Sequence, residues 1–449
     1  MNTKAIACLA VALSIAGAGT AHAQAKFGCG GTNPTAPTIS PNLTTKGADR
    51  TDLGFACMMW QNFVALNWPA LAGQRGMPDT NAKFGAAGPT VWETYKTADQ
   101  TFLPGARNPG PWNQPTLMAT LQAGLAEQVA TGAVRHLTRT SKVSRAVLAS
   151  IARNRKLAAQ VIDSITQAGG GTLYDLNGNP VYYEIAMNQD QYTFIVQNGL
   201  YNANTQAGFA QKQTFALPAG KTQYGSFGSI ELKAAWKVLS ATEQNSGRFH
   251  TIQALLGGSQ TPVTVGLVGF HVFIPDVAQG VWATFAQIDN APIVKPATSG
   301  TFNFFNPNCT LPGTSTPCPV NVKDADPGQV LQVNPDNPSV GGLNAYMQGL
   351  IKAYDASTPW QFYKIVDVQW SLQPVPLARL KRPLIAPLPQ GSPNHPNVVN
   401  AVLETFLQKP NVGCLSCHSN ATVANSGIRS ISAATGYSFM FGEASVPAP

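Results

Sequence analysis

Residues 264–275 have the sequence TVGLVGFHVFIP, a run of valine, phenylalanine and isoleucine that contains one histidine, His271. β-Branched and aromatic side chains favour extended backbone, so Val263–Ile274 is predicted to be a strand of the core. His271 would then be buried. A buried histidine is usually a hydrogen-bonded core residue, but it can also bind a metal or transfer protons.

Other segments of similar composition predict a sheet around this strand. They are Ser229–Leu239, Trp282–Asp289, Phe362–Trp370, and the pair Thr172–Asp175 and Val181–Ala186, which flanks the turn sequence LNGN. No repeat of 20–50 residues is present, which argues against a propeller or a solenoid.

Four segments predict helices. They are Ala56–Pro69, Leu117–Thr131 closed by Gly132, Ser141–Gln167, and a segment at about Asn397–Gln408. The apolar stripe of the last one consists of Val398, Val399, Val402, Leu403, Phe406 and Leu407. Together these elements predict an α+β fold. A β-rich, irregular large body with several helices would carry the C-terminal helix and the segment that follows it.

The composition indicates a globular, loop-rich protein with few surface charges. Hydrophobic residues make up 44% of the 449 residues and charged residues only 11%, while 34 prolines and 41 glycines are present. Disordered chains are rich in charge and poor in apolar residues, and coiled coils need charged outer faces. Both classes are therefore excluded, and an exported protein is favoured.

The N-terminus has the pattern of a secretory signal peptide. Lys4 precedes the apolar run Ile6–Ala16, and Ala21-His22-Ala23 is a small-x-small cleavage site. The run is too short to span a bilayer, and no later segment has 18 uninterrupted apolar residues. We therefore expect residues 1–23 to be removed, and the mature protein, starting near Gln24, to be periplasmic or secreted without a membrane span.

Six cysteines remain after Cys8 is removed with the signal peptide. In an oxidising compartment an even number invites pairing. Cys309 and Cys318 flank a short loop and predict a local disulfide. Cys29 and Cys57 could form a second one, and the alternative is that these cysteines are buried thiols.

The remaining pair belongs to the sequence CLSCH, Cys414 to His418. Thiols at i and i+3 can each add to a haem vinyl group, and the histidine that follows is placed to bind the iron. A thioredoxin-like dithiol would need a βαβ setting, and a zinc site would need a second ligand pair. We therefore expect one covalently attached haem c, held by Cys414, Cys417 and His418. The motif resembles that of c-type cytochromes.

Three further stretches resemble uncharacterised exported bacterial proteins with a single haem. They are Ser229–Lys233, Trp282–Asn290 and Thr405–His418. The resemblance implies location and cofactor but no reaction. The chain is expected to divide into four units: the signal peptide 1–23, a mixed α+β body 24–373, a proline-rich arm 374–396 and a haem-attachment segment 397–449. That last segment is too short to enclose a haem, so the body should form part of the wall.

The sixth iron ligand would decide the function. Met440, in the aromatic stretch YSFMFG, and the buried His271 are the main candidates. Weaker ones are His250, Met58 and Met59, and a vacant position is also open. His136 and His395 are expected to be exposed.

The leading hypothesis is an exported single-haem c-type cytochrome that transfers electrons in the periplasm. The net charge of +8 is too small to imply nucleic acid. A basic face formed by Arg139, Lys142, Arg145, Arg153 and Lys156 could dock an acidic redox partner, although such a face is more often simply solvated.

The alternative is a haem-dependent oxidoreductase of the peroxidase or oxygenase type, with a pocket in the body for a small apolar substrate. A third possibility is an adhesion or ligand-binding protein with a vestigial haem. The sequence contains no GxSxG elbow, HExxH motif or Walker A motif.

Overall fold

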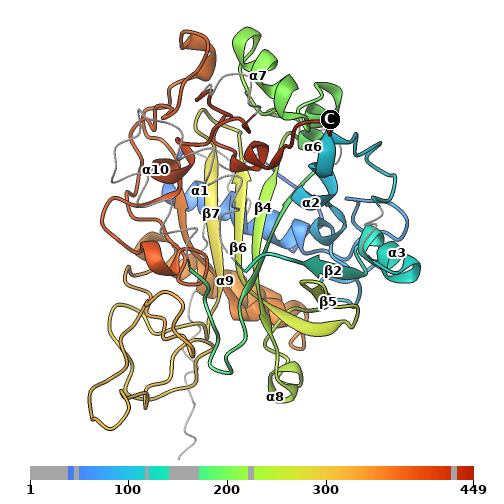
Figure 1. The fold of residues 1–449 in the computed structure, drawn as a ribbon. Helices are drawn as coiled ribbons and strands as arrows, with labels where there is room; N and C mark the ends of the chain where they lie inside the picture. The colour runs from blue at the N-terminus through green and yellow to red at the C-terminus, as the bar shows by residue number, and fades with distance from the viewer. Residues whose placement is uncertain are drawn as a thin grey trace, which may run out of the picture.

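The protein has an α+β fold built on a large, curled, mixed sheet (Figure 1). The computed structural model describes residues 39–44, 50–116, 121–140, 171–220, 227–425 and 432–448. The expected signal peptide and the expected helix Ser141–Gln167 lie outside these residues. Within them, no helix is long and apolar enough to cross a membrane.

The described α-helices are mostly short. They are α1 (Asp52–Leu66), α2 (Ala98–Thr101), α3 (Ala123–Thr131), α6 (Gln189–Gln197), α7 (Ala203–Lys212), α8 (Ala241–Gln244), α9 (Pro338–Tyr354) and α10 (Cys414–His418). The expected helix 56–69 corresponds to α1, which begins four residues earlier because Thr51 caps it by accepting a hydrogen bond from the backbone N–H of Gly54. Helix α3 ends at Gly132, as expected, with a positive φ of 83°.

The strands are β1 (Lys96–Thr97), β2 (Val134–Leu137), β3 (Tyr182–Met187), β4 (Glu231–Val238), β5 (Thr251–Leu256), β6 (Val263–Ile274), β7 (Val281–Gln287) and β8 (Tyr363–Gln369). Five of the six predicted strands are present as β3, β4, β6, β7 and β8, and the predicted strand Thr172–Asp175 is wrong. Strand β6 has the predicted bounds. The expected hairpin before β3 is reduced to one bridge, between Tyr174 and Pro180.

The sheet forks at β6. Its main order is β1-β3-β4-β6-β5-β2, while β7 pairs with both β6 and β8. Strand β5 pairs with residues 263–266 of β6 and β7 pairs with residues 269–274, on the side opposite β4. Among the strand pairs of the described residues, only β2–β5 is parallel. Strand β8 is therefore an edge of the sheet.

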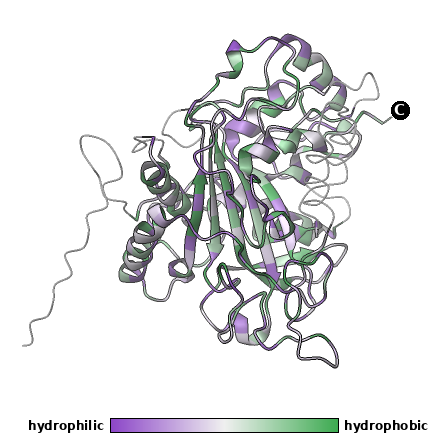
Figure 2. Ribbon diagram, turned by 90° about the vertical axis from the view of Figure 1, so that its left-hand side faces the viewer, coloured by the Kyte–Doolittle hydropathy of each residue, from purple (hydrophilic) through white to green (hydrophobic). Residues whose placement is uncertain are grey.

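The two faces of the sheet are covered differently. Helices α1 and α9 pack together against one face (Figure 2), where Phe63 of α1 stacks on Phe285 of β7 with 4.4 Å between ring centroids. On the other face, Lys233, His271 and Thr284 lie side by side on β4, β6 and β7. Because side chains alternate along a strand, His271 points away from the helical layer. The segment after residue 397 covers this second face.

The expected helix at Asn397–Gln408 is wrong. The segment consists of turns and one short 3-10 turn, Thr405–Leu407, although all six residues of its apolar stripe are buried. The cause is Asn400, whose amide nitrogen donates to Thr284 Oγ1 and the Phe285 carbonyl while its oxygen accepts from the N–H of Val402. Such local side-chain bonds compete with the helical backbone pattern.

The long proline-rich loops are irregular, as predicted. The disulfide between Cys309 and Cys318 is confirmed. Cys57 is also disulfide-bonded, and its partner lies outside the described residues, so the pairing with Cys29 stays a prediction. The end of the arm 374–396 lies beside the end of β8, where the backbone N–H of Asn394 donates to the carbonyl of Trp370 and its side-chain amide donates to the carbonyl of Val368. The arm thereby covers part of the exposed sheet edge.

Candidate functional site

A cavity lies between the sheet and the C-terminal segment. The space between its walls is about 1090 Å³, a figure that includes open solvent at its mouth. Its walls are mostly apolar and come from the sheet and from the C-terminal segment. They include Ile185, Phe273, Trp282, Val399, Leu403 and Phe439. The CLSCH sequence lines the same cavity with Cys414, Cys417 and His418. The body therefore forms part of the wall around the predicted haem-attachment residues.

Helix α10 presents this motif to the cavity, and Gln369 at the end of β8 holds the helix in place. The side-chain oxygen of Gln369 accepts a hydrogen bond of 2.7 Å from the backbone N–H of Leu415, and its nitrogen donates to the carbonyl of His395. Gly413 precedes the helix, and a Cβ there would lie only 2.6 Å from Gln369 Nε2. A glycine is needed at this point for the close approach.

His418 is oriented by one hydrogen bond and two aromatic rings. Its Nδ1–H donates a hydrogen bond of 2.7 Å to the carbonyl oxygen of Tyr437. Its ring lies 4.3 Å from the ring of Trp282 and 4.9 Å from that of Phe439, measured between centroids. Burial lowers the pKa of His418 to about 4, so the imidazole is neutral at neutral pH. Nε2 therefore carries a free lone pair, the form in which histidine binds metals.

The two thiols are undissociated at neutral pH. Burial raises the pKa of Cys414 well above its ordinary value and raises the pKa of Cys417 to about 11. A redox-active dithiol needs a lowered thiol pKa, so this setting does not favour that alternative. The zinc alternative also lacks support, because the described residues contain no group of three or more His, Cys, Asp or Glu placed to hold a metal ion.

The donor set and the cavity fit a haem c. Two thiols one helical turn apart, a neutral imidazole with a free Nε2 and a large apolar cavity are what covalent haem attachment requires. Cys414 and Cys417 would hold the ring through thioethers, and His418 would bind its iron.

His271 lines the same cavity but uses its nitrogens differently. Its Nε2 lies 3.0 and 3.1 Å from the two carboxylate oxygens of Glu404. Burial alone would raise the pKa of Glu404, but its ion pair and hydrogen bond with His271 outweigh burial and, with Lys233 and the N–H of Asn400, lower that pKa to about 2. The ionised carboxylate accepts a hydrogen bond from Nε2–H, so Nδ1 rather than Nε2 is the ring nitrogen left to bind a metal.

Lys233 lies beside His271, its cross-strand neighbour on β4. Its side chain lines the cavity, and its ammonium lies 5.8 Å from the ring centroid of Tyr183. No ion pair or hydrogen bond of its side chain occurs within the described part of the chain. Burial lowers the pKa of Lys233.

Two further carboxylates line the cavity, and both have donors. Glu231 accepts hydrogen bonds from Ser438 Oγ at 2.5 Å and Gln191 Nε2 at 2.8 Å, and burial raises its pKa. Glu443 pairs with Arg139 at 2.7 Å.

Arg139 also pairs with Asp99, and its side chain is only 19% exposed. It is therefore not available for the proposed basic docking face. Lys142, Arg145, Arg153 and Lys156 lie outside the described residues.

The other candidates for the sixth ligand do not line the cavity. Met440 is fully buried, with its sulfur 3.9 Å from Gln191 Nε2, and the residues just before it flank His418. His250 binds Glu93 through Nε2 at 2.6 Å and stacks on Trp360. Met58 and Met59 are core residues of α1. Of all the candidates, only His271 shares the cavity with the motif.

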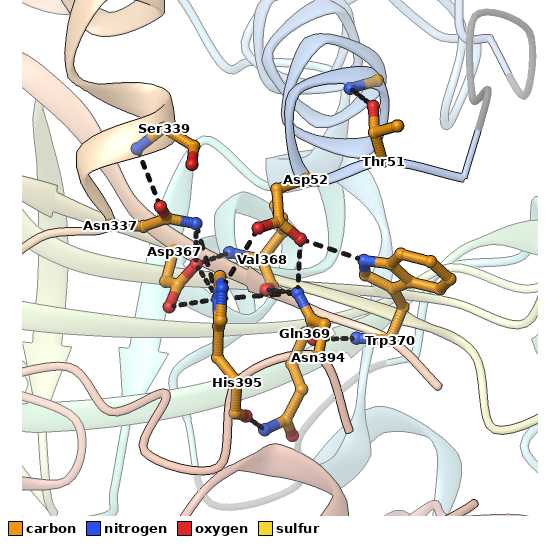
Figure 3. Close-up of polar contacts among 11 residues, drawn as sticks. Thr51, Asp52, Asn337, Ser339, Asp367, Val368, Gln369, Trp370, Asn394 and His395 are labelled. Atoms are coloured by element: carbon orange, nitrogen blue, oxygen red, sulfur yellow. Dashed lines mark hydrogen bonds and ion pairs between the residues drawn. The ribbon is translucent and has the colours of Figure 1, made fainter. Parts of the chain in front are cut away.

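The expectation that His395 and His136 are exposed is wrong. His395 lies between two carboxylates, with Nε2 3.0 Å from Asp52 and Nδ1 3.1 Å from Asp367 (Figure 3). Its hydrogen bonds with Asp367 and Asp52 raise its pKa to about 10, so it is a cation at neutral pH. His136 is half-buried, with Nε2 3.1 Å from the carbonyl of Gly257.

The histidine His395 joins the helical layer to the site. Asp52 opens α1, Asp367 lies on β8, and the His395 carbonyl accepts the bond from Gln369, which also holds α10. Sequence analysis missed His395, Gln369 and Glu404, because their partners lie far away in the chain. For Glu404 the sequence does contain one signal, because a carboxylate within the apolar stripe of residues 397–408 indicates a buried partner.

Searches against protein-family models, curated proteins and solved structures find no match to this chain.

Proposed function

We propose that this protein is an exported single-haem c-type cytochrome that transfers electrons in the periplasm. The observation that carries the proposal is the placement of Cys414, Cys417 and His418 in one apolar cavity, with His418 Nδ1 hydrogen-bonded to the Tyr437 carbonyl. The haem would supply a one-electron couple. The proposed export depends on the signal-peptide pattern before Gln24, and the proposed acidic redox partner on the net positive charge.

The chain's own groups would set the properties of the cofactor. The Tyr437 carbonyl fixes the tautomer and the orientation of His418 and increases the basicity of Nε2. Trp282 and Phe439 pack against the imidazole of His418 and would limit access of water to it. Gln369 keeps both thiols at one end of the cavity by anchoring α10.

A second candidate is a haem-dependent oxidoreductase of the peroxidase or oxygenase type. One observation favours it, namely that Met440, His250, Met58 and Met59 do not line the cavity. An iron without a strong sixth ligand can bind and activate small molecules. A small apolar substrate would share the cavity with the haem.

The experiment is periplasmic expression together with haem-attachment machinery, followed by haem staining of a denaturing gel. We expect stained protein for the natural sequence and loss of the stain in Cys414→Ser with Cys417→Ser. The matched control is Cys309→Ser with Cys318→Ser, which removes two cysteines remote from the motif and should keep the stain. An unstained natural protein would contradict the proposal.

A further inference from the structure

We propose that Glu231 takes up a proton when the haem is reduced and releases it on oxidation, so that this protein moves a proton together with its electron. The inference rests on the proposed haem site and gives that site a second function. In the balanced step, one electron passes from the redox partner to the ferric iron, and one proton from the solvent at the cavity mouth neutralises the Glu231 carboxylate. Oxidation returns both.

The first argument is the position of Glu231. It lies on β4 two residues before Lys233, so both side chains leave the sheet on the same face. It lines the cavity that also contains Cys414, Cys417 and His418. Apolar walls screen charges weakly, so a carboxylate in this cavity responds strongly to a change of one charge on a cofactor bound there.

The second argument is the way in which Glu231 is hydrogen-bonded. Its Oε2 accepts both bonds, from Ser438 Oγ at 2.5 Å and from Gln191 Nε2 at 2.8 Å. Ser438 Oγ itself accepts from the N–H of Met440 at 3.3 Å, so its own proton is directed to the carboxylate. Within the described part of the chain, Oε1 makes no hydrogen bond. A proton can therefore be added at Oε1 without displacing an existing donor.

Ser438 also connects Glu231 to the predicted iron ligand. The residue before it is Tyr437, whose carbonyl accepts the hydrogen bond from His418 Nδ1–H. Two neighbouring residues of the C-terminal segment thus bind the carboxylate on β4 and the imidazole on α10. The carboxylate and the imidazole are held on the same short stretch of backbone.

The third argument is that no cation stabilises the ionised form of Glu231. It has no ion pair among the residues that the structure describes, and burial raises its pKa. The other titratable groups near it have different partners or carry no charge. They are Lys233, which is coupled to Glu404, His271, which binds Glu404, Glu443, which pairs with Arg139, Asp190 of α6, which accepts from the N–H of Gly228, and the uncharged His418, Cys414 and Cys417.

The direction of the coupling follows from these charges. Reduction adds one negative charge to the cavity, which raises the pKa of Glu231 further and favours its protonated form. By linkage, protonation of Glu231 favours reduction to the same extent. At a pH between the pKa values of the oxidised and reduced protein, each electron is therefore accompanied by a proton.

The test is the midpoint potential of the purified, haem-stained protein, measured by spectroelectrochemical titration between pH 5 and 9. We expect an interval in which the potential falls with rising pH by up to about 59 mV per pH unit, the shift that a tenfold change in proton concentration gives for one electron. Glu231→Gln, which keeps the shape of the side chain, should remove this interval. A pH-independent potential in the natural protein, or the same interval in Glu231→Gln, would overturn the inference.

Two further variants test the assignment. Glu443→Gln is the matched control, because it also removes a carboxylate from the cavity wall, but one that Arg139 keeps ionised. It should shift the potential and retain the interval, and loss of the interval would show that Glu231 is not the group responsible. Ser438→Ala removes a donor that favours the ionised carboxylate, so the interval should move to higher pH. An unmoved interval would contradict the assignment.

A second readout detects the proton itself. In the infrared difference spectrum of reduced minus oxidised protein, we expect the C=O band of a protonated carboxyl group, present in Glu443→Gln and absent from Glu231→Gln. The gel stain separates the two possible failures. Stained protein without this band and without pH dependence would overturn the proton coupling and keep the proposed cytochrome, whereas unstained protein would overturn the cytochrome itself.

Discussion

Two histidines face the same cavity, yet their hydrogen bonds leave different nitrogens free. The sequence predicts the role of His418, because the residues that define it are its immediate neighbours in the CLSCH motif. For His271 the sequence predicts only a core position. Its partner, Glu404, is 133 residues away, and no local pattern links the two. Residue chemistry could thus be predicted where it is local, and not where folding brings two distant groups together.

The charged His395 makes stability depend on pH. Its pKa is raised to about 10 by Asp367 and Asp52, so its contribution is complete below its ordinary pKa of 6.5 and is lost as pH rises through 10. We expect the free energy of unfolding to fall by about 1–2 kcal/mol over this range, since the side chain is 32% exposed and partly screened. Urea denaturation at pH 6, 8 and 10 measures this.

The matched controls for this prediction are two asparagine variants. His395→Asn should remove most of the decrease, whereas His136→Asn, at a half-buried histidine without a carboxylate partner in the described residues, should retain it. The same slope in His395→Asn as in the natural protein would show that another group titrates.

The sequence predicts most of the strands near their observed positions, but it wrongly predicts a helix in the segment before the CLSCH motif. Strand β6 has its predicted bounds because a run of β-branched and aromatic residues has few alternatives. The segment 397–408 has helical spacing of apolar residues, but Asn400 ties it to β7 and prevents a helix. Helix α9 was missed, since its three glycines weaken the helical pattern and tertiary packing on α1 compensates.

Helix α10 depends on the missing side chain of Gly413. Its φ is −154°, which any residue can adopt, so the obstacle to a larger residue is contact alone. In Gly413→Ala the new Cβ would meet Gln369 Nε2 at 2.6 Å and the Pro396 carbonyl at 3.0 Å. We expect a loss of about 1–3 kcal/mol in stability and reduced haem attachment, measured by urea denaturation and by haem stain.

The comparison variant is Gly349→Ala in the exposed part of α9, where a Cβ meets nothing within 4 Å. Here alanine should raise the stability by about 0.5–1 kcal/mol, because glycine is unfavourable within a helix. It should leave haem attachment unchanged. If Gly413→Ala behaved like Gly349→Ala, Gln369 would not constrain the start of α10.

In the whole molecule, the cavity is assembled from residues spread between Ile185 and Glu443. Residues of β3, β4, β6 and β7 line this cavity together with the motif. Which strands do so could not be predicted, since that depends on the fork at β6 and on the register of β4, β6 and β7.

We expect haem to protect the C-terminal segment against proteases, because it would fill the cavity between that segment and the sheet. In limited proteolysis read by mass spectrometry, Cys414→Ser with Cys417→Ser should be cut first within 397–443, and loaded protein much later. The exposed loop between Cys309 and Cys318 provides an internal control and should be cut equally in both. Equal cutting of 397–443 would show that the segment is stable without the cofactor.

The chain order of the cavity walls has a consequence for biogenesis. The sheet residues on β4, β6 and β7 precede Cys414 by more than a hundred positions, whereas the segment that closes the cavity follows β8. In the export that we propose, which starts from the N-terminus, the sheet would therefore form before the thiols emerge. Attachment of the cofactor would then be a late step of folding. It would require that His418 has been translocated and that the edge strand with Gln369 has formed.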